Sequence, residues 1–174
     1  TSMAEAFYIG QLGTAPLAGL ALAFPMIMLT MMMAGGSFGG AIAGAVAQQL
    51  GAGNRDGAES VALHAFILTI GFSVLFSWLF LSFGATIYST LGGKDDVLKE
   101  ALAYSDLFFS GCMAIWLANV FNAVIRGTGQ MNVAAGAMAL GSIIQILVSA
   151  VFVFGIGPFP ALGIAGAAVG SIVG

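Results

Sequence analysis

Long stretches without a charged side chain constrain this chain more than any other feature. Arg55 and Arg126 each stand at the end of such a stretch, and most of the other ionisable residues are collected between Lys94 and Asp106. The hydrocarbon layer of a bilayer is roughly 30 Å thick, and a helix needs about 20 apolar residues to cross it. The uncharged stretches meet or exceed that length. The sequence therefore predicts an all-α integral membrane protein, a polytopic helical bundle.

The composition supports the same prediction. Charged residues make up 6% of the 174 residues and apolar residues 60%, whereas a soluble domain carries about 25% charge. A net charge of −3 gives no reason to expect a nucleic-acid partner. The single cysteine, Cys112, excludes an internal disulfide and offers no metal-ligand cluster. The chain begins and ends in apolar sequence, so we expect it to be a piece of a longer protein.

Turn signals divide the apolar sequence into segments. GAGNRDG, LGGKDDVLKE and RGTGQ are typical of loops, and Pro158 and Pro160 predict a break before the last segment. Asp95 or Asp96 is expected to cap a helix, and Pro25 predicts a bend inside the second span. The predicted spans are residues 1–10 (partial), 14–50, 58–83, 101–126, 132–154 and 161–174 (partial).

The two arginines predict an orientation. Arg55 and Arg126 lie in the turns after the second and fourth spans, and an alternating topology places those turns on one side of the membrane. Short cytoplasmic loops are enriched in Lys and Arg. We therefore expect this side to be cytoplasmic.

Glu5 is the acidic residue most able to lie inside the membrane. It stands directly before AFYIG, so it reaches lipid depth if the first helix begins upstream of Thr1. A charge at the bilayer centre costs roughly 2.5 to 3.5 kcal/mol on insertion scales, and such groups usually face a cavity, bind a cation or take up a proton. The alternative is a solvated glutamate at the membrane interface.

Ser142, Gln145 and Ser149 are spaced by three and four residues and share one face of the fifth span. An amide and two hydroxyls in line can coordinate an ion or a substrate. Polar side chains also join membrane helices by hydrogen bonds worth roughly 0.6 to 2 kcal/mol. The spacing alone favours this packing role.

Asn119, Asn122 and Arg126 repeat that spacing on the fourth span. Arg126 stands near the helix end, so we expect its side chain to extend to the cytoplasmic interface and not inward. His64 has no HExxH partner and no second ligand within helical reach, so a structural or interfacial role is expected. No catalytic motif stands out, and the sequence predicts no enzyme.

A glycine ladder and a methionine cluster lie within the second span. Gly36, Gly40 and Gly44 recur every four residues, a pattern that lets another helix backbone come close. Met33 belongs to a run of methionines whose adaptable side chains can form a plastic binding wall. Ordinary lipid-facing or core methionine is the alternative.

Four motifs, taken in order, resemble one known family. EAFYIGQLGTAPLAGLALAFP, AQQLGAGNRDGAE, IRGTGQMN and FVFGIGPFPALGIAGAAVGS are similar to successive helix junctions of the multidrug and toxic compound extrusion (MATE) transporters. The resemblance covers nearly the whole chain and agrees with the predicted loops. It implies that residues 1–174 are the amino-terminal membrane lobe, about half of a twelve-helix, two-lobe transporter.

The resemblance also implies a function. MATE transporters export cationic or amphipathic organic compounds in exchange for H⁺ or Na⁺, as multi-pass proteins of the inner (plasma) membrane. They need no cofactor and no nucleic acid, and their partners here would be the lipid bilayer and the missing carboxy-terminal lobe. Two alternatives stay open: a flippase for lipid-linked precursors or polysaccharides, and a membrane scaffold that transports nothing.

The resemblance carries over to particular positions. Glu5 stands where members have an aspartate tied to coupling, and Gln145 and Ser149 stand where members have an asparagine and, in some, an aspartate. The expected cation or proton coupling residues are Glu5, Gln145 and Ser149. The expected substrate-cavity residues are Tyr8, Met33, Asn119, Asn122 and Ser142. The expected structural or gating residues are Pro25, Gly36, Gly40, Gly44, Gln48 and Arg126.

Overall fold

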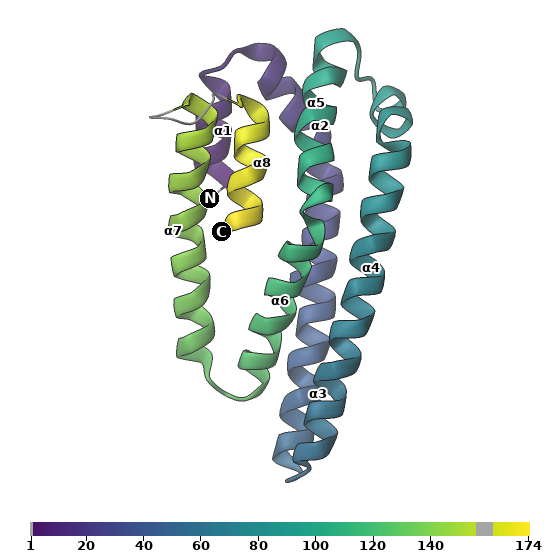
Figure 1. The fold of residues 1–174 in the computed structure, drawn as a ribbon, viewed down its shortest axis with the longest axis vertical. Helices are drawn as coiled ribbons and strands as arrows, with labels where there is room; N and C mark the ends of the chain where they lie inside the picture. Colours follow the sequence, from purple (N-terminus) through teal and green to yellow (C-terminus); the bar gives the residue numbers. More distant parts are fainter. Residues whose placement is uncertain (1, 156–161) are drawn as a thin grey trace.

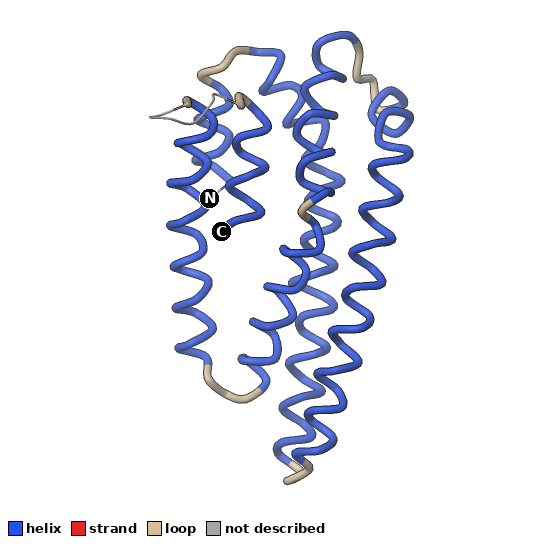
Figure 2. The backbone as a smooth tube through the Cα atoms, in the orientation of Figure 1, coloured by secondary structure: helices blue, strands red, loops and turns tan. Residues whose placement is uncertain are grey.

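The structure is a bundle of helices without a strand in its described part. It is a computed structural model that describes the backbone of residues 2–155 and 162–174, and the side chains from residue 6 onward within those ranges. Helices joined by short turns account for nearly all of it (Figure 2). In chain order they are α1 (Ser2–Gly10), α2 (Thr14–Met31), the π-helix η1 (Met32–Phe38), α3 (Gly39–Gly51), α4 (Arg55–Thr90), α5 (Asp95–Ser110), α6 (Cys112–Gly127), α7 (Met131–Phe154) and α8 (Ile164–Val173). The predicted all-α class is confirmed.

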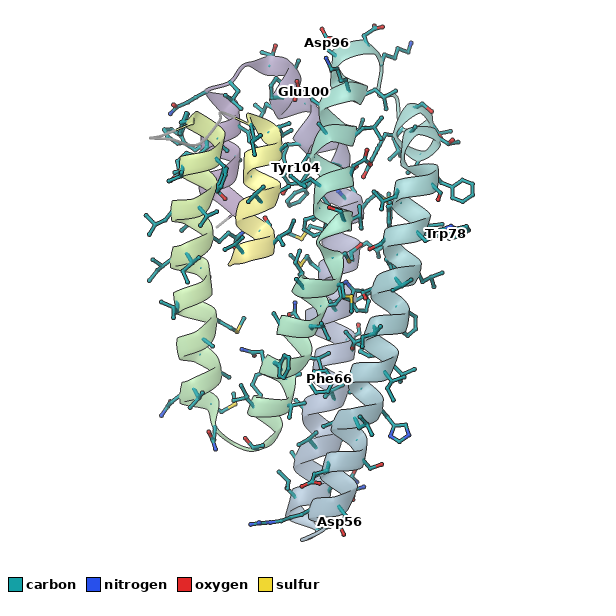
Figure 3. All side chains as sticks on the ribbon, viewed as in Figure 1. Asp56, Phe66, Trp78, Asp96, Glu100 and Tyr104 are labelled. Carbon is teal, nitrogen blue, oxygen red and sulfur yellow. The ribbon has the colours of Figure 1, made fainter. Side chains whose placement is uncertain are left out.

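Helix length and charge placement are those of a membrane protein. Thr14–Gly51, Arg55–Thr90 and Met131–Phe154 are each long and apolar enough to cross a bilayer. At 1.5 Å per residue α4 is about 54 Å long, so it extends beyond a hydrocarbon layer of about 30 Å. The labelled acidic side chains lie toward opposite ends of the bundle, Asp56 at one and Asp96 and Glu100 at the other (Figure 3).

The fourth span differs from its prediction. Residues 101–126 were expected to form one helix, but α5 and α6 are two helices that meet at Gly111 and are bent by 51°. The bend lies where the backbone approaches α8, because a Cβ on Gly111 would fall 2.4 Å from side-chain atoms of Ile172.

The expected aspartate cap of α5 is also wrong. Lys94 is the residue before α5, its side chain makes no capping hydrogen bond, and Asp95 and Asp96 lie in the first turn.

Arg55 begins α4 and Arg126 lies in the last turn of α6. The turns next to these two residues lie at the same end of the molecule (Figure 1). In the turn before α4, Gly53 adopts a φ of 73°, and the Asn54 side chain accepts a hydrogen bond of 2.9 Å from the Gly57 amide. That contact caps the helix in the usual way. The turn between α4 and α5 lies at the opposite end, as an alternating topology requires.

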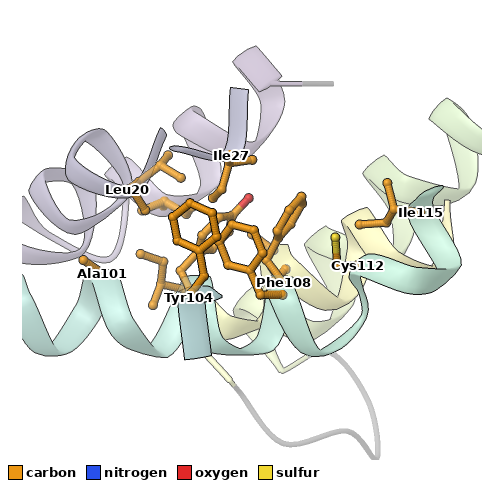
Figure 4. Packing of buried hydrophobic residues seen from close by; sticks show 14 of the residues in the cluster. Leu20, Ile27, Ala101, Tyr104, Phe108, Cys112 and Ile115 are labelled. Carbon is orange, nitrogen blue, oxygen red and sulfur yellow. The ribbon is translucent and has the colours of Figure 1, made fainter. Parts of the chain in front are cut away.

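The main core is built around α2 and α5 and also takes buried residues from α1, α4, α6, α7 and α8. Leu20 and Ile27 face Tyr104 and Phe108 (Figure 4). The helices approach closely at Gly19, where a Cβ would fall 2.8 Å from the Cβ of Glu100. A smaller core joins α3, α4 and α6; its buried members are Ile42, Val46, Ala65, Val120 and Ala123.

The second span contains a π-helical segment that the sequence did not predict. Pro25 lies inside α2, which continues as a helix as far as Met31; the bend expected at Pro25 stays a prediction. Further along the span, seven residues at Met32–Phe38 form a π-helix. The side chain of Thr30 donates a hydrogen bond of 2.9 Å to the Met26 carbonyl just before this segment.

The glycine ladder is a correction. Gly36, Gly40 and Gly44 are exposed, and a Cβ on any of them would have no described atom within 4 Å apart from the helix's own backbone. The close approach is made instead by Gly39, which lies against Arg126 and Ala123 on α6. Within the described residues the predicted ladder therefore makes no close helix contact.

The close packing of α6 on α3 gives a stability prediction. Replacing Gly127 by alanine should lower the thermal unfolding midpoint of the full-length protein, because the new Cβ would fall 2.7 Å from the Val46 Cβ and 2.9 Å from the Ala43 carbonyl oxygen. Overpacking of this kind costs about 1 to 3 kcal/mol. Gly44→Ala is the matched control, since it enters open space and should keep the midpoint or raise it. Equal midpoints for the two variants would contradict the packing described for α3 and α6.

Candidate functional site

Two cavities lie beside α7 and α8. The first, which we call the α2–α5 cavity, has a volume of 440 Å³. Its lining is mainly apolar and comes from α1, α2, α5, α7 and α8. The lining residues are Ala6, Leu17, Leu20, Ala21, Phe24, Ile27, Met28, Met31, Tyr104, Phe108, Gln145 and Ser171.

The second cavity, which we call the α6–α7 cavity, has a volume of 310 Å³ and carries more amide and hydroxyl groups. It is lined by Met31, Ile115, Ala118, Asn119, Asn122, Ala137, Met138, Ser142, Gln145, Ser171, Ile172 and Gly174. None of the described residues that line either cavity has an ionisable side chain apart from the Tyr104 phenol. The described linings therefore offer hydrogen-bonding, aromatic and apolar groups.

Three residues line both cavities: Met31, Gln145 and Ser171. Gln145 Nε2 donates a hydrogen bond of 3.2 Å to Ser171 Oγ, which in turn donates to the Ala167 carbonyl at 3.3 Å. These contacts connect α7 to α8. We call Met31, Gln145 and Ser171 the partition, because these three residues line both cavities.

Ser171 was missed by the sequence reasoning. It stands in the last apolar segment, in GSIVG, where a single serine among glycines reads as a packing residue. Only the antiparallel packing of α7 on α8 brings it within hydrogen-bonding distance of Gln145. The polar spacing on the fifth span did identify Gln145.

The other two expected coupling residues are placed differently. The backbone of Glu5 lies in α1, but its side chain lies outside the described residues; the next residue, Ala6, lines the α2–α5 cavity. Ser149 is fully buried and lines neither cavity. Its hydroxyl packs so closely on Gly170 that a Cβ there would overlap it.

The expected substrate residues separate into two groups. Asn119, Asn122 and Ser142 all line the α6–α7 cavity, and Asn122 Nδ2 also donates a 3.1 Å hydrogen bond to the Ala134 carbonyl of α7. Tyr8 and Met33 line neither cavity. Tyr8 packs edge-on against Phe154, with ring centroids 5.6 Å apart, and Met33 packs against the main core.

The expected gating residues also have definite positions. Pro25 and Gln48 are exposed, Gln48 near the end of α3. Arg126 is a correction. It is half-buried, its Nη2 lies close to Gly39, and its Nε is buried without a hydrogen-bond partner. The guanidinium therefore reaches back along α6 toward α3 and does not extend to the interface as expected.

No group of three or more His, Cys, Asp or Glu side chains that could hold a metal ion occurs among the described residues. His64 lies on the rim of a third hollow, of 380 Å³, between α3 and α4. Its Nδ1 lies 2.7 Å from the carbonyl oxygen of Ser60. This local contact matches the structural role expected for it.

Comparison with known proteins identifies the family. A family model described as MatE matches residues 1–171. The chain belongs to the MatE family. A FAD transporter from Shewanella oneidensis is 32% identical over 171 residues, which are 98% of this chain and 38% of that protein. A probable multidrug resistance protein NorM from Thermotoga maritima is 26% identical over 172 residues, covering 98% of this chain and 37% of its own length.

Solved MATE structures have the same fold. An inward-facing multidrug resistance MATE transporter of the MOP superfamily superposes with a TM-score of 0.91 at 30% identity, covering 98% of this chain and 38% of that one. An outward-facing structure of such a transporter gives 0.88 at 29% identity, with 98% and 37% covered. The chain thus spans little more than a third of the length of these relatives. The family consists of multi-pass inner-membrane transporters and not enzymes, as the sequence predicted.

Proposed function

We propose that this chain forms one lobe of an ion-coupled exporter of cationic or amphipathic organic compounds, exchanged for H⁺ or Na⁺. The observation that carries the proposal is the partition, a hydrogen-bonded Gln145–Ser171 pair between an aromatic cavity and an amide-rich one. Membership of the MatE family supports the transport function. The remainder of the full-length transporter would supply the second lobe.

The α2–α5 cavity suits the apolar body of such a compound. Phe24, Tyr104 and Phe108 provide aromatic surface, and Met28 and Met31 provide side chains that adapt to different shapes. Aromatic faces attract organic cations by cation–π interaction, worth about 0.5 to 2 kcal/mol. This lining needs no acidic residue to hold a cation and tolerates many ring systems. The cavity volume of 440 Å³ lies in the usual range for small-molecule sites.

The coupling ion would bind near the partition. Glu5 stands one residue from Ala6, which lines the α2–α5 cavity, and the amide and hydroxyl oxygens of Gln145 and Ser171 are ligands that a hard cation prefers. Ser149 is fully buried behind Gly170, so we replace it with Ser171 in the proposed set. Exchange requires the ion and the compound to prefer different states of the lobe, since a ligand that binds both equally shifts nothing.

A substitution at the partition tests this assignment. Gln145→Met keeps the side-chain length but removes the amide, so gradient-driven efflux of a fluorescent organic cation from proteoliposomes should become less sensitive to the ion. Hydrogen bonds to charged groups contribute about 1.5 to 3 kcal/mol, which corresponds to roughly a 10- to 100-fold higher half-saturating ion concentration. The measurement is the initial efflux rate as a function of H⁺ or Na⁺ concentration.

Gln130→Met is the matched control, because Gln130 is exposed and makes no capping hydrogen bond through its side chain. The control should leave the ion dependence unchanged. If Gln145→Met also leaves it unchanged, the partition does not take part in coupling. Comparing Na⁺ at fixed pH with H⁺ at fixed Na⁺ identifies the coupling ion.

A flavin nucleotide is the second candidate substrate, favoured by one observation. The Shewanella oneidensis relative, 32% identical over this chain, is described as a FAD transporter. The aromatic lining can stack a planar ring, but the described lining residues offer no Lys or Arg for a pyrophosphate. Efflux of FAD and of an organic cation, measured side by side in the same vesicles, separates the two candidates.

A further inference from the structure

The π-helix η1 interrupts the longest apolar helix of the chain. Residues Met32–Phe38 join α2 to α3 within Thr14–Gly51, which is otherwise one continuous span. The amide of Gly39 donates to the Ala34 carbonyl five residues earlier, as π-helical bonding requires. Such segments are rare and occur mostly as single turns, often at functional sites. Two adjacent glycines, Gly35 and Gly36, lie at its centre.

The buried stripe of this span shows what the π-helix does. The stripe consists of Leu20, Ala23, Ile27, Thr30, Ala34, Gly39, Ile42 and Val46. Successive members are three or four residues apart, as in any α-helix, except across the π-helix, where Ala34 and Gly39 are five apart. One extra residue therefore sits inside the turn. It keeps the buried face of α2 on α5 and the buried face of α3 on α6, although α5 and α6 are bent by 51°.

The π-helix also touches the functional site. Met31, the residue directly before it, belongs to the partition and lines both cavities. Asn119 lines the α6–α7 cavity, and its Oδ1 lies 2.9 Å from where a Cβ on Gly35 would be. At the other end of the segment, Arg126 Nη2 lies 3.3 Å from the Cβ position of Gly39. The segment therefore adjoins one partition residue, Met31, and its Gly35 lies against Asn119 of α6.

We propose that η1 is a hinge: the turn alternates between π- and α-helical bonding and so moves Met31 toward or away from the Gln145–Ser171 pair, closing or opening the passage between the two cavities. One residue corresponds to about 100° of rotation and about 1.5 Å of rise in an α-helix. A change of that kind turns the buried face of α2, together with Met31, relative to the buried face of α3. This inference rests on the proposed transport function only for its physiological role.

The decisive variant is deletion of Gly36 in the full-length transporter. Removing one residue turns the five-residue step into a four-residue step, so the span can form a continuous α-helix with both buried faces still in place. Gly40→Ala, in α3 just beyond η1, is the matched control. It keeps the length of the chain and adds a methyl group where no described atom lies within 4 Å apart from the helix's own backbone.

Spin labels at Ala18→Cys and Ala47→Cys, both exposed positions on either side of η1, report the hinge by electron–electron distance measurements. Native Cys112 is fully buried and should not react. In the otherwise wild-type protein and in Gly40→Ala we expect two distances whose populations change about tenfold on titration with H⁺ or Na⁺. In the deletion variant we expect one distance, an unchanged unfolding midpoint and transport reduced roughly tenfold or more.

A deletion variant that keeps both distances, or transports at the wild-type rate, overturns the proposal. A single distance in the wild type under every ion condition does the same. If the deletion prevents folding, Gly35→Ala takes its place, because its Cβ must displace the Asn119 amide without changing the chain length; unchanged distance populations in that variant count against the hinge. The distances are recorded without any transported compound. Two ion-dependent distances without efflux of any compound tested would therefore support the hinge and count against the proposed substrates.

Discussion

Replacing Glu5 by glutamine should reduce gradient-driven efflux from proteoliposomes to the level of empty vesicles, while binding of the exported compound persists. Glutamine has nearly the same shape but cannot take up a proton or carry a negative charge for a cation. Without that group the ion no longer prefers one state of the lobe, so its gradient cannot drive exchange. Initial rates of dye efflux under an imposed H⁺ or Na⁺ gradient give the measurement, and equilibrium dye binding shows whether the site survives.

Glu59→Gln is the control for this substitution. Glu59 is exposed in the second turn of α4, so its neutralisation changes the net charge by the same amount at a solvated position. We expect efflux by Glu59→Gln to match the wild type. Full gradient-driven efflux by Glu5→Gln would remove Glu5 as the coupling group and leave the partition to be tested without it.

Replacing Gly166 by alanine should lower the stability of the full-length protein more than the Gly127→Ala substitution does. Gly166 on α8 faces the backbone of α7, where a Cβ would fall 2.5 Å from the Phe152 carbonyl carbon and 2.6 Å from the Val153 nitrogen. Backbone atoms cannot rotate away as a side chain does, so the two helices must separate. We expect a loss of about 3 kcal/mol or more, seen as a lower thermal unfolding midpoint in detergent.

Gly136→Ala on α7 provides the comparison. Gly136 has no described atom within 4 Å of its Cβ position apart from the helix's own backbone, and alanine is the better helix former by about 1 kcal/mol. This variant should unfold at the wild-type temperature or slightly above it. Because the partition hydrogen bond crosses the same interface, Gly166→Ala should also weaken ion-driven efflux. A Gly166→Ala protein as stable as Gly136→Ala would contradict the α7–α8 packing.

The α6–α7 cavity illustrates how far local sequence patterns reach. Asn119 and Asn122, three residues apart on one predicted helix, and Ser142 and Gln145, three apart on another, were each assigned to a shared face, and all four line this cavity. A helix of 3.6 residues per turn makes that inference sound wherever the helix is regular. The sequence pattern did not identify Ser171, because its role depends on a contact between two helices and not on the spacing of residues along one helix.

The glycines show where local patterns fail. Gly36, Gly40 and Gly44 have the spacing of a packing ladder, yet Gly39 makes the contact with α6. The extra residue in η1 sets which face of α3 is buried. The periodicity of GGSFGGAIAG does not predict this extra residue. Pro25 was the obvious candidate for an irregularity, but α2 passes through it and the irregularity follows seven residues later.

The amino-acid sequence by itself determined that this is a membrane protein of the helical class and that it belongs to this family. The reason is that the spacing of charged residues along the chain must match a hydrocarbon layer of fixed thickness. The tertiary structure alone decided which faces of those helices meet. The tertiary structure buries Ser149 and brings Ser171 to Gln145. It also bends α5 against α6 and places the π-helix η1 directly after Met31. These contacts depend on how closely two helix backbones approach at glycines such as Gly19, Gly39 and Gly166. That distance is set by both helices together, so the sequence pattern of one helix does not predict it.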